Sequence, residues 1–464
     1  MIEAKMETRR DAGSVVVACP DARPPAYQAV IGLGRAGLLQ RFLTSSYYDP
    51  DGPLATLARR LDPKRLPRLE RVLLRRHDAE IPADRVSTVP CVDLSLRIEA
   101  RLAGRTQTIK RLLAQARATW FDRRLARLLA RCRPGALLVF SDVGSAATLP
   151  LCRRLGIPTI LSMVHGDVRE EAEVLNKEAA LAPEFFPIYL GDGVLDRAEL
   201  AWLHRRRLRD IALADLVLVP SDHIAETLVE HGTSRQKIRV VPYAADCRRF
   251  RPLAGKRHDP SCTFLFAGGI TQRKGIKYLL EAWSRVRRPG WKLQLLGALP
   301  TNPGPLSPLL DQVELLGRVA HADVPARMAA ADVFVFPSLF EGSAVVTYEA
   351  LACGLPCVVT PAAGSVVRDG VEGLLVGPRD VNGLAQCMEQ LGGSPKDRAG
   401  MSTKARSRAL EFDWPRYHAA IVGEVTSLIA RVDPRGTPER KVPHGCNRSV
   451  TKSGRTTGSG VFHG

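Results

Sequence analysis

The sequence predicts an α/β fold built from two domains, each with its own parallel sheet. The chain has 464 residues, which is too long for one compact core. Short runs of β-branched residues alternate with longer segments rich in Leu, Ala and Arg, which is the pattern of repeated β-α units. The polar, proline-containing stretch RRFRPLAGKRHDPS (248–261) divides these units into two groups and is the expected linker.

Short apolar runs mark the expected strands, and such runs are typical of parallel strands that helices cover on both faces. Because ligands of open parallel sheets bind at the carboxyl ends of the strands, we expect functional residues in the loops that follow them. The strands expected in the first half are Ser14–Cys19, Ala136–Ser141, Thr159–Met163, Asp215–Pro220 and Ile238–Pro242. Those expected in the second half are Thr263–Ala267, Lys292–Leu296, Gln312–Leu316, Asp332–Phe336, Pro356–Thr360 and Gly373–Val376.

The expected boundaries follow from these groups and from composition. After Val432 the chain becomes rich in Gly, Ser, Thr and basic residues, which is typical of disorder. We expect an N-terminal tail over 1–12, a first domain over 13–250, a second domain over 251–412, a final helix over 413–431 that packs back on the first domain, and a tail over 432–464.

Composition narrows the classes of function. Lys and Arg number 67 against 48 Asp and Glu, so the net charge is +19, which favours partners that are phosphorylated, acidic or membrane-bound. No segment approaches the length of a membrane span, and the early apolar run GSVVVAC is too short for a signal peptide. The ten cysteines form no CxxC pair, so we expect reduced thiols in a cytoplasmic protein and no metal site.

The motif GLGRAG (32–37) matches the GxGxxG pattern of dinucleotide-binding proteins. That fingerprint must follow a strand directly and open a helix. Here twelve residues, three of them prolines, separate it from the end of the first expected strand at Cys19. We therefore interpret PAYQAVIGLGRAG as the latter part of a helix that ends at a glycine, and not as an NAD site.

The segment AADVFVFPSLFEG (330–342) is a buried strand followed by a loop that delivers Glu341. The next segment, SAVVTYEALACG (343–354), is expected to be a helix capped by Ser343 and stopped by Gly354. The start of such a helix, at Ser343, Ala344 and Val345, offers free N–H groups to an anion such as diphosphate.

Two glutamates, Glu341 and Glu349, stand eight positions apart in this segment. Eight residues of helix span roughly 12 Å, more than the about 5–9.5 Å that separates the carboxylates of glycosidase pairs. We therefore expect them to contact different ends of one elongated ligand with a charged middle. An isolated pair of this spacing could equally be two solvated helix residues, and only its context favours a site.

That context includes FAGGITQRKGIKYLLEAW (266–283), where a strand ends at Gly268 and Gly269. Glycines let the backbone approach a ligand closely, and the cations Arg273 and Lys274 can neutralise phosphates. The alternative for this stretch is an ordinary solvated basic turn.

Together, GGITQRKG, VELLGRVAHADVPARMAAADVFVFPS and EGSAVVTYEALACGLPCVV resemble the retaining glycosyltransferases of family 4. The resemblance is specific from about 215 to 377 and weaker before it. It implies the GT-B fold, which consists of two Rossmann-like doubly wound domains facing each other across a cleft.

The resemblance also implies roles for individual residues. Glu349 would hold the ribose hydroxyls of a nucleotide-sugar donor, Glu341 would contact the donor sugar, and Lys274 would neutralise the diphosphate. His165 follows a strand in TILSMVHGDVREEAE, where the family often has a histidine facing the donor sugar, so it is a candidate for stabilising or positioning that sugar. No cofactor and no metal are implied.

Three departures from the family pattern affect this assignment. Gly269 stands where many members carry an arginine, so Arg273 is expected to supply the second cation. Ala344 replaces a common glycine, and CPDARPPAY replaces the Gly-Gly turn after the first strand.

Two basic segments, 63–77 and 108–132, interleave leucines with arginines and lysines. Either they are helices with one core face and one solvated face, or they lie on an anionic membrane surface. The second interpretation would fit a lipid-linked acceptor and a peripheral location on the inner face of the membrane.

The sequence thus predicts transfer of a sugar from a nucleotide-sugar to a hydroxyl of an unknown sugar, lipid-linked or small-molecule acceptor, in polysaccharide or glycoconjugate biosynthesis. One alternative is a non-catalytic sugar-nucleotide sensor on the same fold. Another is a basic nucleic-acid-binding protein, although the sequence contains no recognised nucleic-acid motif; we therefore expect no nucleic-acid partner.

Overall fold

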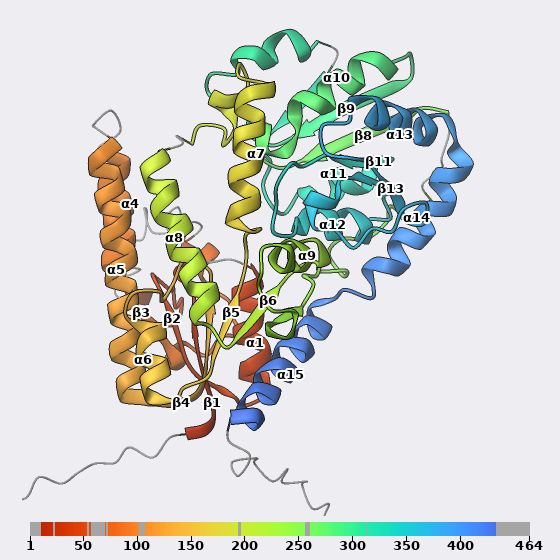
Figure 1. Cartoon of the computed structure of the whole chain (residues 1–464). Coiled ribbons are helices and arrows are strands. Elements are labelled where there is room, and N and C mark those ends of the chain that lie inside the picture. Colours follow the sequence, from red (N-terminus) through yellow and green to blue (C-terminus); the bar gives the residue numbers. More distant parts are fainter. Residues whose placement is uncertain are drawn as a thin grey trace, which may run out of the picture.

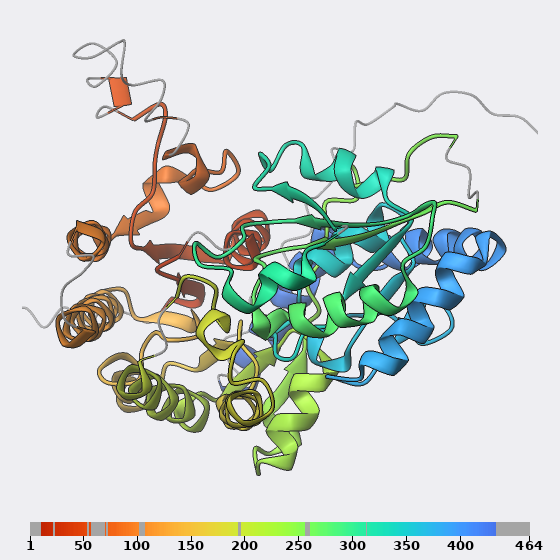
Figure 2. The same cartoon turned by 90° about the horizontal axis from the view of Figure 1, so that it is seen from above.

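The computed structural model describes residues 11–21, 24–52, 55–56, 70, 73–101, 107–193, 196–255, 260–311 and 313–432. It confirms the α/β class with two sheet-based domains (Figure 1), which separate to the left and right when seen from above (Figure 2). Within these residues one sheet has seven strands in the order β3-β2-β1-β4-β5-β6-β7, and the other has six in the order β10-β9-β8-β11-β12-β13. The strands of both sheets pair in parallel.

The first domain alternates strands with helices. Its strands are β1 Asp11–Ala18, β2 Leu39–Thr44, β3 Val86–Thr88, β4 Pro134–Phe140, β5 Thr159–Ser162, β6 Leu216–Val219 and β7 Ile238–Val240. Its described helices are α1 Pro24–Arg35, α4 Pro90–Arg101, α5 Gln107–Cys132, α6 Thr148–Leu155, α7 Val168–Leu181, α8 Arg197–Leu213 and α9 Asp222–Glu230.

The second domain repeats the alternation. Its strands are β8 Cys262–Ala267, β9 Trp291–Leu296, β10 Val313–Gly317, β11 Val333–Phe336, β12 Cys357–Val359 and β13 Gly373–Leu375. Its helices are the short 3-10 turn η5 Gln272–Lys274, then α10 Ile276–Val286, α11 Val324–Ala330, α12 Val345–Ala352, α13 Val381–Gly393 and α14 Pro395–Ala409, before the final helix α15 Trp414–Val432.

Each of the eleven strands expected from the sequence is present, with ends shifted by at most three residues. Two strands of the first sheet, β2 and β3, were not expected. β2 reads LQRFLT, and its Gln40 and Arg41 interrupt the apolar run. β3 is a three-residue edge strand that pairs only with β2, and an edge position needs little apolar sequence.

The central strands of both sheets are buried on both faces, as their apolar sequences require. In β11 all four residues, VFVF, are fully buried, and Phe336 stacks on Phe266 of β8 with ring centroids 5.6 Å apart. In β4 all seven residues are buried. These rigid strands fix the start of every loop that contributes to the site.

The chain crosses between the domains at two places that lie side by side. Ala245, on the first crossing, pairs with Asp413 on the second, and its N–H donates to the carbonyl of Phe412 (3.3 Å). The guanidinium of Arg406 donates to the carbonyls of Cys247 (3.0 Å) and Phe250 (2.9 Å). The crossings therefore form one tied connection between the domains.

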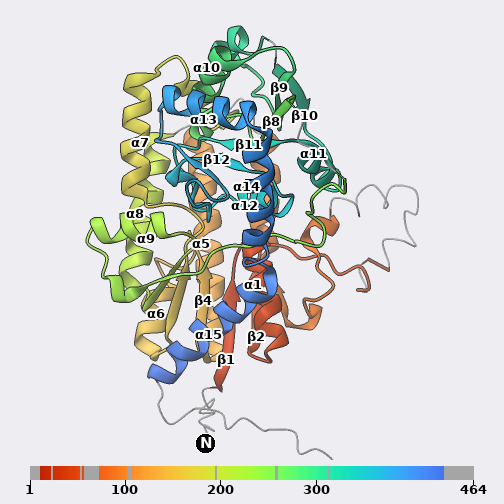
Figure 3. The same ribbon diagram turned by 90° about the vertical axis from the view of Figure 1, so that its right-hand side faces the viewer.

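After the second crossing, α15 runs back along the first domain beside α1 (Figure 3). The hydroxyl of Tyr417 donates to the carbonyl of Pro25 (3.1 Å), and His418 Nε2 lies 2.7 Å from Gln28 Oε1. The motif GLGRAG (32–37) falls at the end of α1, as expected, and Gly32 allows α15 to approach: a Cβ there would lie 2.8 Å from the Cβ of His418.

Some expectations concern residues that the structure does not describe. These are 1–10 of the expected N-terminal tail, 433–464 of the expected C-terminal tail, and most of the expected basic helix over 63–77. The second basic segment, 108–132, lies within α5. Among the described helices, none combines the length and the apolar character needed to cross a bilayer.

Substituting the glycines of α1 distinguishes packing from helix propensity. Gly34→Ala should stabilise the protein by up to about 1 kcal/mol, because Ala is the better helix former and the new methyl meets only Leu39, at 3.9 Å. Gly32→Ala should instead destabilise it by about 1–3 kcal/mol, because the methyl collides with His418. Urea unfolding measures both, and equal effects of the two variants would contradict this packing.

Candidate active site

The loop after β8 places two cations at the carboxyl edge of the second sheet. The strand ends at Ala267, and Gly268 follows with φ +143°, a backbone conformation that favours glycine. A Cβ at Gly268 would lie 3.0 Å from Lys274 Nζ. The glycine therefore leaves the space in which the Lys274 side chain folds back over the strand end, 4.8 Å above the ring of Phe336.

Arg273, Lys274 and Glu341 come together although β9, β10 and β11 separate them in the chain. One oxygen of Glu341, Oε1, lies 3.6 Å from a guanidinium nitrogen of Arg273 and 3.4 Å from Lys274 Nζ. The three side chains are 27%, 18% and 13% exposed, so each is partly shielded from water while remaining reachable. Two cations facing one carboxylate leave a net positive charge, which can attract an anion.

The helix that follows Glu341 begins later than the sequence predicts. α12 starts at Val345, and its N-cap is Ala344 with no side-chain cap, so the expected capping by Ser343 is wrong. The hydroxyl of Ser343 instead donates to the carbonyl of Gly364 (2.7 Å) and lies 3.2 Å from the Tyr348 hydroxyl. Gly354 ends the helix with φ +72°, as expected.

This start of α12 determines which backbone groups can meet an anion. The N–H of Ala344 already donates to the carbonyl of Ala363 (3.0 Å). The N–H groups of Val345 and Val346 belong to the first helical turn and have no partner within the helix. The expected distance of roughly 12 Å between Glu341 and Glu349 assumed one continuous helix, whereas Glu341 lies on a loop before it.

Glu349 lies on α12, half-buried, beside the loop that follows β10. Burial raises the pKa of its carboxyl to about 7, and the positive charge of Arg249 opposes the rise. Arg249 itself donates to the carbonyl of His321 in that loop. A carboxylate held here without a strong ionic partner is ready to accept hydrogen bonds from a neutral ligand such as a sugar diol.

The loop that carries His165 reaches this site from the first domain. A Cβ at Gly342 would lie 2.4 Å from the carbonyl oxygen of Val164 and 3.2 Å from the amide nitrogen of His165. The loop after β5 therefore touches the loop that carries Glu341. The hydroxyl of Ser221, from the loop after β6, also donates to the carbonyl of Gly342 (3.1 Å).

The sequence analysis missed the partners of His165. Its Nε2 lies 3.3 Å from Asp142, whose carboxylate accepts two hydrogen bonds from Arg207, at 2.6 and 3.1 Å. Burial raises the pKa of Asp142, but the charge of Arg207 and the contact with His165 outweigh burial and hold it well below its usual range. Asp142 follows β4 directly, so its position at a strand end was the available signal.

The positions expected to form a site thus fall into three groups. The first group lies around the ends of β8 and β11 and consists of Gly268, Gly269, Arg273, Lys274 and Glu341. The second group lies at or along α12 and consists of Ser343, Ala344, Val345 and Glu349. The third is His165, in the loop after β5 of the first domain. The structure brings Arg273, Lys274 and Glu341 together, and it places the loop of His165 against the loop that carries Glu341.

Two family models match the chain and together span most of its length. One, described as Glycosyltransferase Family 4, matches residues 69–249, and the other, described as Glycosyl transferases group 1, matches residues 261–393. The division between them falls within the predicted linker.

Curated relatives carry glycosyltransferase names. The "MMP alpha-(1->4)-mannosyltransferase" of Mycolicibacterium hassiacum is 27% identical over 374 residues, which are 76% of this chain and 88% of the relative. The "D-inositol 3-phosphate glycosyltransferase" of Pseudarthrobacter chlorophenolicus is 32% identical over 272 residues, which are 52% of this chain and 64% of the relative.

Solved structures share the fold at low identity. Sucrose-phosphate synthase from Thermosynechococcus elongatus matches with a TM-score of 0.61 and 18% identity, over 90% of this chain and all of that one. HepE from Anabaena, in complex with UDP-glucose, matches with a TM-score of 0.54 and 16% identity, over 89% of this chain and 99% of that one. These matches confirm the two-domain GT-B fold.

The buried carboxyl of Glu349 should make stability depend on pH. Its folded-state pKa of about 7 exceeds the ordinary glutamate pKa of 4.5, so the native state holds a proton that the unfolded state loses. Stability therefore falls as pH rises from 4.5 to 7. Glu349→Gln should be close to neutral at pH 5 and stabilising by on the order of 2–3 kcal/mol at pH 8.

Thermal unfolding across this pH range measures the effect. Glu389→Gln is the matched control, because Glu389 is a 64%-exposed residue of α13, and it should shift the melting temperature little at any pH. A stabilisation by Glu349→Gln that does not grow between pH 5 and pH 8 would contradict the burial of this carboxyl.

Proposed function

The chain belongs to the group 1 glycosyltransferases of family 4, and we propose that this enzyme moves a sugar from a nucleoside diphosphate sugar to an acceptor hydroxyl with retention of anomeric configuration. HepE, which shares the fold, holds UDP-glucose, which agrees with a donor of this class. We place the reaction in the biosynthesis of a polysaccharide or glycoconjugate.

The observation that carries the proposal is the cluster of Arg273, Lys274 and Glu341 at the start of α12. The positive end of a helix and two partly buried cations favour a diphosphate between them. Among the described residues, neither cation has a carboxylate within 3 Å, so a phosphate oxygen could replace Glu341 as their nearest anion. The diphosphate would then lie between Glu341 and Glu349, with the sugar and the ribose at its two ends.

The chemistry follows from this placement. The bond between C1 of the donor sugar and the diphosphate oxygen breaks while the acceptor oxygen bonds to C1, and the acceptor's proton passes to the departing diphosphate. Negative charge grows on the diphosphate in the transition state. Arg273, Lys274 and the first N–H groups of α12 stabilise that charge, and because they are already in place, no solvent has to reorganise during the reaction. We propose that they do so without a metal ion.

The position of Glu341 supports retention. Its carboxylate oxygen lies within 3.6 Å of both cations, so it stands on the side where the diphosphate leaves. A carboxylate on that side is not placed to attack C1 from the opposite face. Attack by the acceptor on the leaving-group side retains the configuration, with Glu341 and His165 holding the sugar hydroxyls from the two domains.

Loss of one cation should slow transfer. Lys274→Met should lower kcat by about 100-fold or more, because it removes charge from the departing diphosphate, while transfer by the unaltered enzyme should persist in EDTA. Proton NMR of reactions with UDP-, GDP- and ADP-sugars reports both turnover and the anomeric configuration of the first product. Lys292→Met, at a 60%-exposed lysine of β9, is the matched control and should leave kcat unchanged.

Three outcomes would overturn parts of the proposal. A product of inverted configuration would exclude retention, and loss of activity in EDTA would exclude the metal-free mechanism. Tight nucleotide-sugar binding with neither transfer nor hydrolysis would identify a non-catalytic sensor instead.

A second surface favours an anionic membrane as the acceptor's location. Helices α4 and α5 lie side by side at the edge of the first domain (Figure 1) and carry most of the large apolar side chains that this domain exposes. α5 has one acidic residue, Asp122, which is buried. The exposed apolar and basic residues of these two helices that would form the surface are Leu94, Leu96, Ile98, Ile109, Leu112, Trp120, Arg123, Arg124, Arg127 and Arg131.

Vesicle sedimentation tests this surface. The protein should bind vesicles of phosphatidylglycerol and phosphatidylcholine, but not phosphatidylcholine alone, and salt should weaken binding. Replacing Arg123 and Arg127 by Gln removes about 2 kcal/mol, or about thirtyfold in affinity. Leu112→Glu, at a 58%-exposed site, should also release the protein, whereas Leu410→Glu, at a 47%-exposed site in the second domain, should not. Equal binding to vesicles with and without phosphatidylglycerol would contradict the proposed membrane-binding surface.

A further inference from the structure

Within the described part of the chain, one buried carboxylate of the first domain accepts hydrogen bonds only from side chains of the second domain. Glu178 lies on α7 and is fully buried. It accepts hydrogen bonds from Gln272 (2.6 Å), from the Tyr278 hydroxyl (3.0 Å) and from Arg379 Nε (2.7 Å). Burying a charge is costly unless it is paired and hydrogen-bonded, and here three elements of the other domain satisfy it.

Apolar contacts join the same two surfaces. Val174 and Leu175, one turn before Glu178 on α7, pack in one cluster with Tyr278, Leu339 and Phe340 of the second domain. Figure 1 shows α7 standing against the second domain, while Glu171 near its start still pairs with Arg207 of α8 (3.4 Å). The helix therefore docks on the second domain although it continues the chain from β5.

The partner Gln272 is the first residue of η5, the turn that carries Arg273 and Lys274. The side chain of Gln272 is fully buried, so its amide cannot find water if Glu178 is lost. The backbone of Arg273 is held on both sides: its N–H donates to the carbonyl of Tyr189 (3.1 Å), and its carbonyl accepts from the N–H of Leu339 (2.9 Å). Tyr189 follows α7 in the chain, so the docked segment contacts the cation turn twice.

Arg379 completes the contact at some conformational cost. It is one of three described non-glycine residues with positive φ (+70°), a conformation that persists where the surroundings hold it. Its side chain points Nε at Glu178. Burial and the adjacent charge of Glu178 raise the pKa of Tyr278 above its usual value, so its hydroxyl stays protonated and donates.

We propose that Glu178 is a positioning residue for the donor diphosphate: by holding Gln272 and Arg379, it keeps η5 where Arg273 and Lys274 face Glu341, so that diphosphate binding depends on docking of α7. The inference rests on the proposed function. Because α7 follows His165 directly, the same segment places the histidine opposite the sugar and fixes the cations at the diphosphate.

Calorimetric titration with nucleotides separates this role from a general structural one. The probes are the mono- and diphosphates of uridine, guanosine and adenosine, and the base that binds the unaltered protein is used thereafter. Glu178→Gln should weaken diphosphate binding by about tenfold or more, since small misplacement of positioning groups has large effects. It should leave monophosphate binding unchanged, because the proposed ribose contact, Glu349, lies on α12 and not on η5. In turnover, the donor KM should rise while the acceptor KM stays constant.

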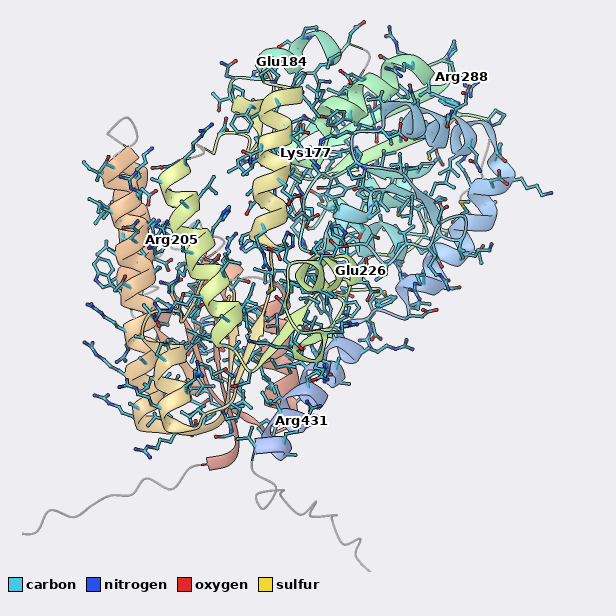
Figure 4. All side chains as sticks on the ribbon, in the orientation of Figure 1. Lys177, Glu184, Arg205, Glu226, Arg288 and Arg431 are labelled. Carbon is cyan, nitrogen blue, oxygen red and sulfur yellow. The ribbon has the colours of Figure 1, made fainter. Side chains whose placement is uncertain are left out.

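Two further variants keep the test decisive. Gln272→Met removes the hydrogen bond to Glu178 from the second domain and changes no charged residue, so it replaces Glu178→Gln if that variant does not fold. It should weaken diphosphate binding by the same factor and leave monophosphate binding unchanged. Lys177→Ala is the matched control, because Lys177 precedes Glu178 on α7 and is exposed (Figure 4). It should leave all affinities unchanged.

Other results would overturn the proposal. Equal loss of mono- and diphosphate binding, or no loss in either Glu178→Gln or Gln272→Met, would show that Glu178 does not position the cations. If the unaltered protein binds no nucleotide and transfers no sugar, the proposed function itself fails, and this inference fails with it.

Discussion

The contact between the loop after β5 and the loop after β11 is the constraint on which the rest of the site depends. Gly342 and Gly166 allow it, because a Cβ at either position would lie within about 2.5 Å of the opposite loop. Both loops leave the carboxyl ends of buried central strands, so their close approach brings the functional edges of the two sheets together. The loops that carry His165 and Glu341 are therefore in direct contact.

The charges around this contact leave an excess of positive charge on the side of the second domain. Arg273 and Lys274 outnumber the single carboxylate they face, and the first turn of α12 adds the positive end of a helix. Asp142 is already neutralised by Arg207. An anion entering between the sheets therefore meets positive potential on the side of the second domain and hydrogen-bonding groups on the side of the first.

Patterns within a few residues were predictable, whereas contacts across the fold were not. The strands and the stop at Gly354 follow from local sequence. The start of α12 did not, because Ser343 bonds to Gly364, 21 residues away. Glu178 stands among other glutamates in VREEAEVLNKE and resembles any solvated helix acid, since its partners lie 94 to 201 residues away. The positive φ of Asp142 has no signature in sequence.

The central claim is that the space between the sheets is a nucleoside diphosphate site. Thermal unfolding in the presence of UDP, GDP, ADP and NAD tests it most directly, because a ligand at one hundred times its dissociation constant adds about 2.7 kcal/mol to the stability of the state that binds it. The account predicts a rise in melting temperature with one nucleoside diphosphate and none with NAD. A rise with NAD alone, or no rise with any nucleotide, would contradict it.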